Sequence, residues 1–363
     1  MIQLLRINRP FCWTGQHRKL VCNVPGFAGF NLNQHTIQTA VTQITLINNF
    51  RIQLPMDDQQ PPRYQPKTQQ YHVFEQDGWE SVQPGSCEGI AALISFSILS
   101  WNIDFTRPLT DVRMKVALAH LKTLYRREAK PSILMLNECL DSDLELIKGE
   151  DWIRQTYAIT DVSSEHWTHH YGTCILVPKF MPIKAVFRVP YKKTAMGRDA
   201  LFVDIALPQD KTLRICSTHL ESFVRNPPWR TSQLTTAAHF MHQADASVLG
   251  GDLNAIEDFD KTLHIDNGLK DAYLENGGEE GAPEGMTWGQ MAATSSREMF
   301  GLTRMDKILY CGGVEVEDFE TFGMDVVLEG EDAEELMKET ALGLEKAWVT
   351  DHLGVRANLR VVW

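Results

Sequence analysis

The segment Gly251-Asp252-Leu253-Asn254 places a carboxylate and a carboxamide two positions apart, directly after an apolar run at 247–250. Such a run of Val and Leu with small residues is typical of the end of a buried strand, and the two glycines should let the backbone turn sharply. Positions i and i+2 of an extended backbone share a face, so Asp252 and Asn254 should point into the same space. An acid and an amide there suit a water molecule and a phosphoryl oxygen. A turn capped by an aspartate explains the segment equally well.

Polar residues of the same kinds end, or lie next to, five further strand-like runs. A single such residue most often satisfies a turn or a polar group of the core. Six strand ends that each carry Asn, Asp, Glu or His can converge on one site, because catalytic groups gather where the strands of a sheet end. These residues are Asn102, Asn137 with Glu138, His219 with Glu221, Asp252 with Asn254, Asp306, and Asp351 with His352.

The chemistry open to these groups is narrow. The chain has no Gly-x-Ser-x-Gly elbow, no Walker loop, no dinucleotide-binding fingerprint and no His-Glu-x-x-His motif. Carboxylates and amides without thiolates or clustered histidines favour a hard divalent cation, hence Mg²⁺ or Mn²⁺ over Zn²⁺. Such a metal binds phosphate directly, and nearby histidines can supply protons or neutralise developing charge. The sequence therefore predicts metal-assisted phosphodiester hydrolysis.

Alternating strands and helices must position these groups from about residue 90 onward. The spacing of apolar residues predicts a helix at 110–127, a second helix after Asp141, and a third from Pro228 to about His242. Many strands, with helices between blocks of them, indicate two mixed sheets packed face to face and covered by helices, an α+β fold. The predicted strands are 93–101, 133–136, 173–177, 184–189, 200–207, 212–218, 247–250, 305–310 and 354–362.

Composition and charge exclude several classes of protein. The 363 residues are 43% hydrophobic and contain no run of eighteen apolar residues, so we expect a packed core and no membrane span. Seven scattered cysteines without a Cys-x-x-Cys pair indicate a reduced intracellular protein without structural zinc. The net charge of −12 argues against a generic polyanion binder, yet residues 179–230 hold ten Lys or Arg against four acids. That window is either a basic rim beside an anionic substrate or a solvated surface.

The first 70 residues are expected to form a poorly ordered extension and linker, and 71–363 the catalytic domain. Residues 1–55 contain no acid and five Lys or Arg, as in a mitochondrial presequence, but they lack serine. A mispredicted start upstream of Met56 explains them equally well. Residues 57–70 have the composition of a linker. We expect a nuclear or cytoplasmic monomer, or a mitochondrial protein if residues 1–55 are a presequence.

Taken in order, these motifs resemble the endonuclease/exonuclease/phosphatase superfamily, and within it the 5′-tyrosyl-DNA phosphodiesterases. The resemblance covers about residues 93–363 and implies a DNase I-like fold, a four-layer α/β/β/α sandwich. It rests on Ser100-Trp101-Asn102-Ile103-Asp104, Leu136-Asn137-Glu138, Met196-Gly197-Arg198, Thr218-His219-Leu220-Glu221-Ser222, Gly251-Asp252-Leu253-Asn254, Thr287-Trp288, Arg304-Met305-Asp306-Lys307 and Thr350-Asp351-His352.

The resemblance also implies which residues bind the metal. Glu138 is expected to be the main protein ligand of Mg²⁺, with Mn²⁺ as a possible substitute. Asn102 is expected beside it, in contact with metal-bound water or phosphate, and Asp351 is expected near the metal.

The same resemblance implies the catalytic roles. Asp252 is expected to orient and deprotonate the attacking water, and Asn254 to hold a phosphoryl oxygen. His219 is expected to contact the phosphate. His352, oriented by Asp306, is expected to stabilise the pentavalent transition state.

Three further residues are implied substrate contacts. Trp288 is expected either to stack on a nucleotide or to pack in the core. Arg198 and Arg225 are expected either to contact phosphate or to belong to the surface. The chain departs from the family near these positions, because Ile256 stands where the family has arginine and Gly289 where it has an acid.

The function implied is Mg²⁺-dependent hydrolysis of phosphodiester bonds at DNA 5′ ends, including 5′-phosphotyrosyl linkages in the repair of topoisomerase-type adducts. One alternative keeps the fold and the metal but acts on RNA, nucleotides or phospholipids. A second alternative is a non-catalytic binding module, against which the presence of Glu138, Asp252 and His352 argues.

Overall fold

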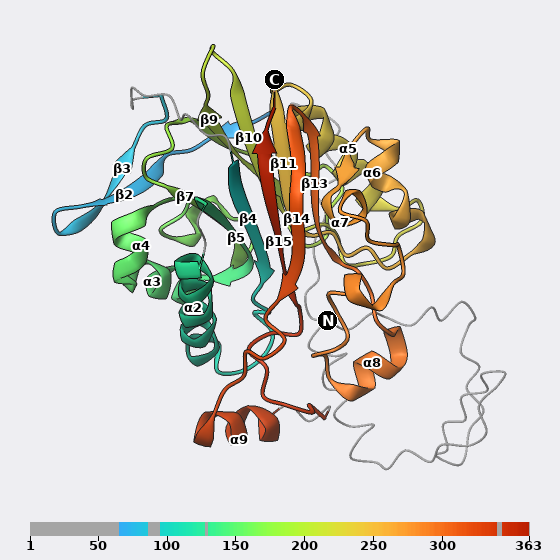
Figure 1. The fold of residues 1–363 in the computed structure, drawn as a ribbon. Coiled ribbons are helices and arrows are strands. Elements are labelled where there is room, and N and C mark those ends of the chain that lie inside the picture. Colours follow the sequence, from blue (N-terminus) through green and yellow to red (C-terminus); the bar gives the residue numbers. More distant parts are fainter. Residues whose placement is uncertain (1–64, 86–94, 128–129, 340–342, 363) are drawn as a thin grey trace, which may run out of the picture. The chain divides into compact units, whose positions relative to one another are not determined.

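The computed structural model describes residues 65–85, 95–127, 130–339 and 343–362, and its strands form two mixed sheets (Figure 1). Sheet A has seven strands in the order β1 (Lys67–Thr68), β8 (Ile183–Pro190), β9 (Asp199–Ala206), β10 (Thr212–Thr218), β11 (Ala246–Asp252), β13 (Asp306–Gly312), β12 (Lys270–Asp271). Sheet B has eight strands in the order β14 (Val314–Phe322), β15 (Gly354–Val361), β4 (Ser95–Asn102), β5 (Ser132–Leu140), β7 (Tyr171–Pro178), β6 (Tyr157–Ile159), β2 (Tyr71–Glu75), β3 (Gly78–Val82).

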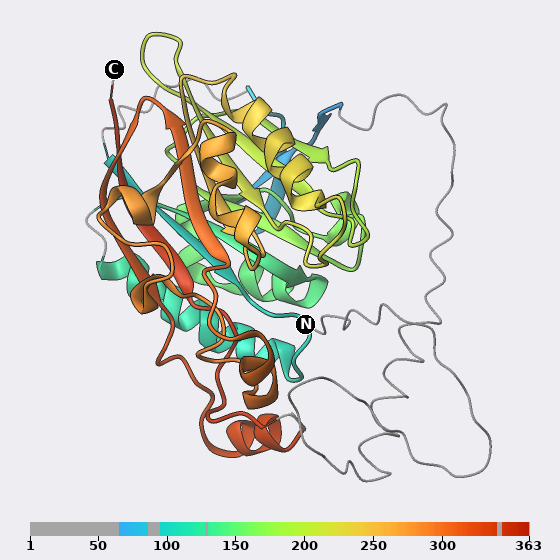
Figure 2. The same cartoon turned by 90° about the vertical axis from the view of Figure 1, so that its right-hand side faces the viewer.

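Helices cover the outer face of each sheet, so the four-layer α/β/β/α sandwich is confirmed. Sheet B packs against α2 (Thr110–Arg127), α3 (Asp141–Gly149) and α4 (Asp151–Thr156). Sheet A packs against α5 (Trp229–Met241) and α6 (Leu263–Asp266), the yellow helices of Figure 2. The remaining helices are α7 (Ala272–Glu275), α8 (Thr294–Phe300) and α9 (Gly330–Glu339).

Apolar side chains of both sheets form the central core between them. Ile98 and Met135 of sheet B lie in one buried cluster with Val203 and Val248 of sheet A. Successive strand residues point to opposite faces, so the other face of each strand packs under the helices. Both faces of the central strands are therefore buried, which explains why they read as continuous apolar runs in the sequence.

The strand directions bring the polar strand ends to one edge of the sandwich. β4 runs parallel to β5, and β10 runs parallel to β11, so all four strands end at that edge. β13 and β15 are antiparallel to β11 and β4, so their first residues lie at the same edge. Four strands therefore end, and two strands begin, at the same edge of the sandwich.

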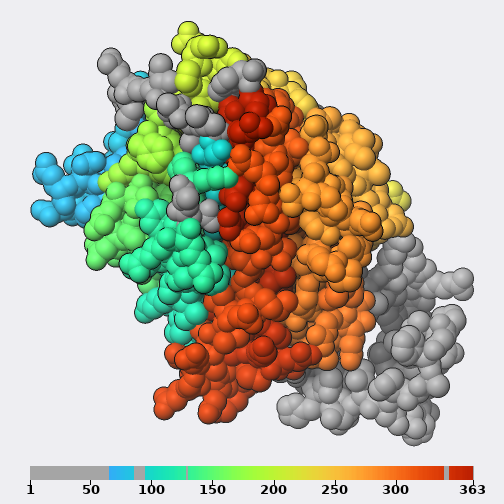
Figure 3. Space-filling view, in the orientation of Figure 1, coloured from blue at the N-terminus to red at the C-terminus, as the bar shows by residue number. Residues whose placement is uncertain are grey.

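The predicted helix at 110–127 is present with the same bounds, and the nine predicted strands are present, most of them with ends shifted by a few residues. The elements that the sequence does not predict lie mostly at the sheet edges, such as the β2–β3 hairpin that projects in blue in Figure 3 and the charged strand β14. The linker predicted at 57–70 is wrong for 67–70, because β1 pairs with β8 and Gln69 donates to Thr160 O at 2.9 Å.

Two further predictions concern chain segments and cysteines. The alternatives for residues 1–55 lie outside the described residues. The four cysteines within the described residues, Cys139, Cys174, Cys216 and Cys311, are buried and free, as expected of a reduced protein. None of the described helices has the length and apolarity needed to span a membrane.

Candidate active site

Three pairs of polar residues join sheet A to sheet B at the edge where the strands end. Asn102 of β4 donates through Nδ2 to Oδ2 of Asp252 in β11 at 3.0 Å. His352, just before β15, shares a 2.8 Å hydrogen bond through Nδ1 with Oδ2 of Asp306 in β13. Oδ1 of Asn137 in β5 accepts from the backbone N–H of Asp252 at 3.1 Å. The site is therefore built from both sheets and exists only where they pack together.

The glycines before Asp252 serve close packing rather than the predicted sharp turn. β11 continues through both of them, with Gly250 opposite Ile308 and Gly251 opposite Lys307. Gly251 has φ 155°, and a Cβ there would lie 1.8 Å from the carbonyl oxygen of Thr218. Only glycine lets the parallel neighbour β10 approach this closely. Asp252 thus ends a rigid central strand, and its side chain also accepts from the backbone two residues on, as an aspartate that caps a turn does.

Asp252 is the centre of the hydrogen-bond network and is fully buried. Its Oδ1 accepts from the backbone N–H of Asn254 at 2.8 Å, and its Oδ2 lies 3.2 Å from Nε2 of His219 and 3.8 Å from Nε2 of His352. Burial alone would raise the pKa of this carboxyl, but the two histidines outweigh burial and lower it. Asp252 is therefore ionised at neutral pH and can accept a proton from a water molecule.

Asn254 lies beside Asp252, as the sequence predicts, but not on a regular extended backbone. Its φ of 48° is in the left-handed region, which Asn tolerates better than most residues. The side chain donates through Nδ2 to Leu220 O at 3.1 Å, while its buried Oδ1 has no hydrogen-bond partner among the described residues. Buried polar atoms are normally paired, so this oxygen marks a position where a ligand donor fits.

Arg198 determines the protonation form of His219. Nη1 of its guanidinium lies 2.6 Å from Nδ1 of the imidazole, and a guanidinium has donors only. Nδ1 must therefore be the unprotonated acceptor, which leaves the proton of a neutral ring on Nε2, facing Asp252. Burial and the Arg198 charge also lower the pKa of His219 to about 4. His219 is thus a neutral hydrogen-bond donor.

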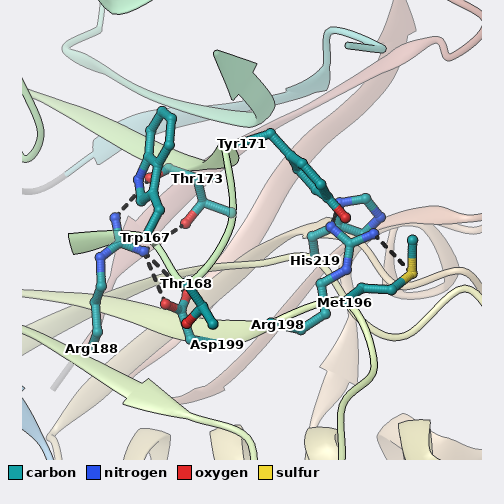
Figure 4. Close-up of a pocket in the computed structure, with 11 residues that line it drawn as sticks. Trp167, Thr168, Tyr171, Thr173, Arg188, Met196, Arg198, Asp199 and His219 are labelled. Atoms are coloured by element: carbon teal, nitrogen blue, oxygen red, sulfur yellow. Dashed lines mark hydrogen bonds and ion pairs between the residues drawn. The ribbon is translucent and has the colours of Figure 1, made fainter. Parts of the chain in front are cut away.

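A pocket of about 310 Å³ borders this pair (Figure 4). Its walls include Trp167, Tyr171 and Met196, and the Arg198 guanidinium lies 5.1 Å from the Tyr171 ring centroid. Arg198 is 6% exposed and forms no ion pair with the described residues. A buried cation without an acidic partner suits an anion, so the structure places Arg198 where a phosphate contact is expected.

Asp306 holds His352 in its cationic form. Burial raises the pKa of Asp306 to about 6, and its carboxylate accepts the 2.8 Å hydrogen bond from His352. Burial would lower the pKa of His352, but Asp306, Asp351 and Asp252 together raise it well above its ordinary value. The imidazolium of His352 therefore faces Asp252 with a fixed orientation, as the sequence-based roles of the two residues require.

Glu138 provides the best cation ligand of the site. It has φ 62°, its Oε2 accepts from the backbone N–H of Phe105 at 3.2 Å, and its Oε1 accepts no hydrogen bond from the described residues. Burial and the nearby Asp104 raise the pKa of this carboxyl to about 7. Nδ1 of His219 lies 3.8 Å from Oε1 of Glu138, and the charges of Arg198 and His352 oppose the increase in its pKa without outweighing it. The oxygens of this carboxylate match the ligands that Mg²⁺ and Mn²⁺ prefer.

The residues around Glu138 fit a hard cation better than a zinc ion. Glu138, His219 and Asp252 lie close enough to hold a metal, as do Asp252, Asp306 and His352. However, Nδ1 of His219 faces Arg198 and its Nε2 carries the ring proton, and the His352 imidazolium is protonated on both nitrogens, so neither ring offers a lone pair to a metal. Carboxylate oxygens are left as the open donors of both groups, which is the chemistry of Mg²⁺ or Mn²⁺ sites.

Asp351 and Trp288 are hydrogen-bonded to each other beside His352, and the predicted position of Asp351 near the metal stays a prediction. Trp288 is 3% exposed, so the prediction that it stacks on a nucleotide is wrong and its packing in the core is found instead. Its indole N–H donates to Oδ2 of Asp351 at 2.8 Å, and Oδ1 of Asp351 lies 3.7 Å from Nε2 of His352. Asp351 is absent from the candidate metal groups of the described residues and contributes negative charge beside His352.

Arg225 and Ile256 lie outside the buried polar cluster. Arg225 is exposed on the loop that follows His219. Ile256, where the resembling family has arginine, packs in an apolar cluster with Trp288 and Met305. Two residues after Asn254, this chain therefore has an apolar side chain where the resembling family has a cation.

Two further residues hold the site together: Asn137, which the sequence predicts as a polar strand end without a role, and Arg113, which it does not predict as part of the site. Asn137 donates through Nδ2 to Ser217 Oγ at 3.4 Å, besides accepting from Asp252. Arg113 of α2 donates to five backbone carbonyls, among them Asp104 O at 2.7 Å and Val349 O at 2.6 Å, and so fixes the two loops that carry Asn102 and His352. Its position on the apolar face of the predicted helix is a signal that could have identified it.

Comparison with known proteins agrees with this geometry. The model of the endonuclease/exonuclease/phosphatase family matches residues 99–352, which contain every polar strand end described above. Comparison with curated proteins gives no match. Solved structures share the fold. TDP2 from Caenorhabditis elegans is 23% identical with a TM-score of 0.56, and the match covers 74% of this chain and 75% of that chain.

Two other solved structures show how broad this fold is. TDP2 from D. rerio, complexed with a single-strand DNA product, is 18% identical with a TM-score of 0.56, and the match covers 74% of this chain and 99% of that chain. A mannosyl-6-phosphatase from Bacteroides thetaiotaomicron is 15% identical with a TM-score of 0.54, over 73% of this chain and 99% of that chain. This chain belongs to the endonuclease/exonuclease/phosphatase family and has the fold of a phosphoric ester hydrolase.

Proposed function

We propose that this protein is a divalent-metal-dependent phosphodiesterase that hydrolyses phosphodiester bonds at DNA 5′ ends, including 5′-phosphotyrosyl linkages. The observation that carries the proposal is the convergence of an ionised Asp252, a cationic His352 and the cation ligand Glu138 on one buried cluster. TDP2, a tyrosyl-DNA phosphodiesterase, has the same fold, and the strand-end motifs of this chain resemble that enzyme class.

In this mechanism Asp252 takes the proton of the attacking water. Its Oδ2 is held by Asn102 and faces His219, so the carboxylate cannot rotate away from the water. The Nε2–H of His219 and the second N–H of the Asn254 amide would bind oxygens of the phosphoryl group, whereas Oδ1 of Asn254 can only accept from a ligand donor. These donors and the His352 imidazolium are fixed before the reaction, so they stabilise the charge that develops in the transition state without reorganising.

Glu138 would hold the metal, with Asn102 beside it. A bound Mg²⁺ or Mn²⁺ would act as a Lewis acid that polarises the phosphoryl oxygens. The chain itself sets the positions of the protons. Asp306 keeps His352 protonated, and Arg198 keeps the His219 proton on Nε2.

Hydrolysis of a 5′-phosphotyrosyl oligonucleotide with Mg²⁺ tests the proposal. We expect turnover by the wild type and a loss of at least about a hundredfold in Glu138→Gln and in Asp252→Asn. Asp258→Asn, which removes an exposed acid, is the matched control and should keep full activity. Equal turnover by the wild type and both site variants contradicts the proposal.

One observation favours a second candidate, a phosphatase or phosphodiesterase for another substrate. Ile256 gives the rim an apolar group where a cation would contact a nucleic-acid phosphate. The mannosyl-6-phosphatase shows that this fold also occurs in an enzyme for a sugar phosphate. A panel containing the tyrosyl oligonucleotide, an RNA end, a sugar phosphate and a phospholipid headgroup distinguishes the candidates by their kcat/KM values.

A further inference from the structure

A small cavity lies between sheet A and its covering helices, away from the catalytic cluster. It is bordered by β13 on one side and by α5 and α6 on the other, the yellow helices of Figure 2. The space inside it is about 260 Å³, which limits a ligand to a few carbon atoms. Five leucines form most of its wall, namely Leu220, Leu234, Leu253, Leu263 and Leu309.

Two buried nitrogen atoms in this wall have no hydrogen-bond partner among the described residues. Lys307 of β13 is 3% exposed, and its Nζ lies 3.8 Å from Glu280 Oε2 and 3.9 Å from Asp271 Oδ2, too far for a hydrogen bond. His264 of α6 is 7% exposed, and its buried Nδ1 is likewise unpaired. Buried polar atoms are normally paired, so an ammonium and an imidazole in the wall of one cavity suit a ligand that accepts hydrogen bonds.

The acids around the cavity are bound to other partners. Asp260, the acid in the wall, accepts from Nε and Nη2 of Arg230 at 2.9 and 2.6 Å, and its Oδ2 also accepts from two backbone N–H groups. The two acids near Lys307 both accept hydrogen bonds from Arg304, in the case of Asp271 at 2.7 Å. The donors of the Lys307 ammonium therefore stay open toward the cavity.

The cavity also lies behind two catalytic residues. Leu220 directly follows His219, and Leu253 directly follows Asp252, and both leucines pack on the helix side of sheet A. The two segments are bonded to each other, because the N–H of Leu220 donates to Asp252 O at 2.9 Å and Asn254 Nδ2 donates to Leu220 O at 3.1 Å. A molecule in the cavity would therefore contact the chain next to the catalytic base without entering the active site.

We propose that this cavity binds a small carboxylate with a short aliphatic chain. The carboxylate accepts hydrogen bonds from Lys307 Nζ and from His264 in its Nδ1–H form, and the chain lies against the leucines. Inorganic phosphate would lose its hydration against an apolar wall, and an alcohol of the same length would bring no charge to the ammonium. The wall thus selects a molecule that has both an anionic and an apolar part.

NMR of the full chain with labelled leucine methyl groups tests the proposal. The protein is titrated with acetate, propanoate and butanoate in EDTA, so that no carboxylate binds through a metal at the active site. We expect the methyl signals of Leu220 and Leu253 to shift, and the affinity to increase about fourfold with each added CH₂ group. Butan-1-ol and inorganic phosphate should bind at least about tenfold more weakly than butanoate.

Two variants separate the anionic and the apolar part of the site. Lys307→Met keeps the length of the side chain without its charge, so we expect butanoate to bind at least about tenfold more weakly and butan-1-ol to bind as before. Leu263→Phe fills the cavity and should abolish the binding of both, which keeps the test valid if Lys307→Met does not fold. Lys270→Gln removes an exposed cation of β12 outside the cavity, and this control should bind butanoate as the wild type does.

Three results overturn the proposal. The first is equal affinity of the wild type for butanoate and butan-1-ol, and the second is an absence of shifts at Leu220 and Leu253 at any concentration of butanoate. The third is butanoate binding by Leu263→Phe as strong as that by the wild type. None of these measurements needs turnover, so the outcome does not depend on the proposed function.

Discussion

Nη1 of Arg198 lies 2.6 Å from Nδ1 of His219, and Nε2 of the same imidazole lies 3.2 Å from Oδ2 of Asp252. The three side chains form a line in which the donor-only guanidinium makes Nδ1 of the imidazole an acceptor and leaves the ring proton on Nε2. The imidazole must accept from Arg198 and donate toward Asp252. Through its contact with Nδ1, Arg198 therefore controls which nitrogen of His219 presents a proton to the site.

Replacement of Arg198 by methionine should release the His219 tautomer. Methionine keeps much of the side-chain volume but has no donor, so Nδ1 of His219 loses its fixed partner. We expect ¹⁵N NMR of labelled histidine to show one pure Nε2–H form in the wild type and a mixture in Arg198→Met. Arg198→Gln retains an N–H donor and should restore the wild-type pattern. An unchanged Nε2–H form in Arg198→Met would refute the role of Arg198.

Asp306→Asn should change the pH dependence of catalysis. The Asp306 carboxylate is the strongest of the three that raise the pKa of His352, so its removal should lower that pKa toward the ordinary value of about 6.5. A group with a raised pKa keeps its proton as pH rises. We therefore expect the wild type to remain active above pH 7 and the variant to lose activity as pH rises through about 6.5.

At pH 8 the loss in kcat for Asp306→Asn should be about a hundredfold, because a neutral imidazole stabilises developing negative charge poorly. Asp318→Asn on the exposed face of β14 is the control and should keep the wild-type profile. Parallel pH profiles for wild type and Asp306→Asn would show that His352 does not depend on Asp306 for its charge.

Metal affinity should depend on pH through Glu138. Its pKa is about 7 in the absence of metal, so below pH 7 a proton competes with the cation for the carboxylate. We expect the apparent affinity for Mg²⁺ to weaken by about tenfold per pH unit below 7 and to level off above it. Isothermal titration calorimetry at pH 6, 7 and 8 measures this. Glu138→Gln should show weak binding at all three values, and a pH-independent affinity of the wild type would exclude Glu138 as the main ligand.

Gly251→Ala should be the most damaging single-methyl change in the site. A Cβ would lie 1.8 Å from Thr218 O, and that backbone belongs to a central strand that cannot move aside. Gly277→Ala is a matched control, because Gly277 also has positive φ but no atom within 4 Å of the added Cβ. We expect Gly251→Ala to cost at least about 2 kcal/mol more in the free energy of unfolding than the control. Equal melting temperatures would show that β10 and β11 can separate locally.

The central elements could be predicted because their signals are local. α2 buries Met114, Ala117, Leu118 and Leu121 on one face, and that spacing is visible in the sequence. The central strands read as apolar runs because both of their faces are covered. β14 could not be predicted in the same way, since its burial pattern mixes exposed acids with few buried residues and it is paired only with β15.

The positions of the catalytic groups could be predicted from strand ends, but their partners could not. Parallel strands end at one edge of a sheet, so Asn102, His219 and Asp252 could be expected to lie close together. Whether a side chain such as Trp288 points into a groove or into the core depends on residues distant in sequence, here Asp351 and Met305. The place of Arg113 on the apolar face of its helix is visible in the sequence, but the five backbone carbonyls to which it donates are not.

Because each sheet supplies half of the polar cluster, the rate of catalysis should depend on the distance between the two sheets. The hydrogen bonds from Asn102 to Asp252 and from His352 to Asp306 cross the sandwich, and directly behind them Gly250 faces Met135, whose sulfur lies 2.7 Å from where a glycine Cβ would be. A core residue slightly too large would separate the base from the amide that orients it while the protein stays folded. Turnover should therefore respond to small changes in the packing of the hydrophobic core between the sheets.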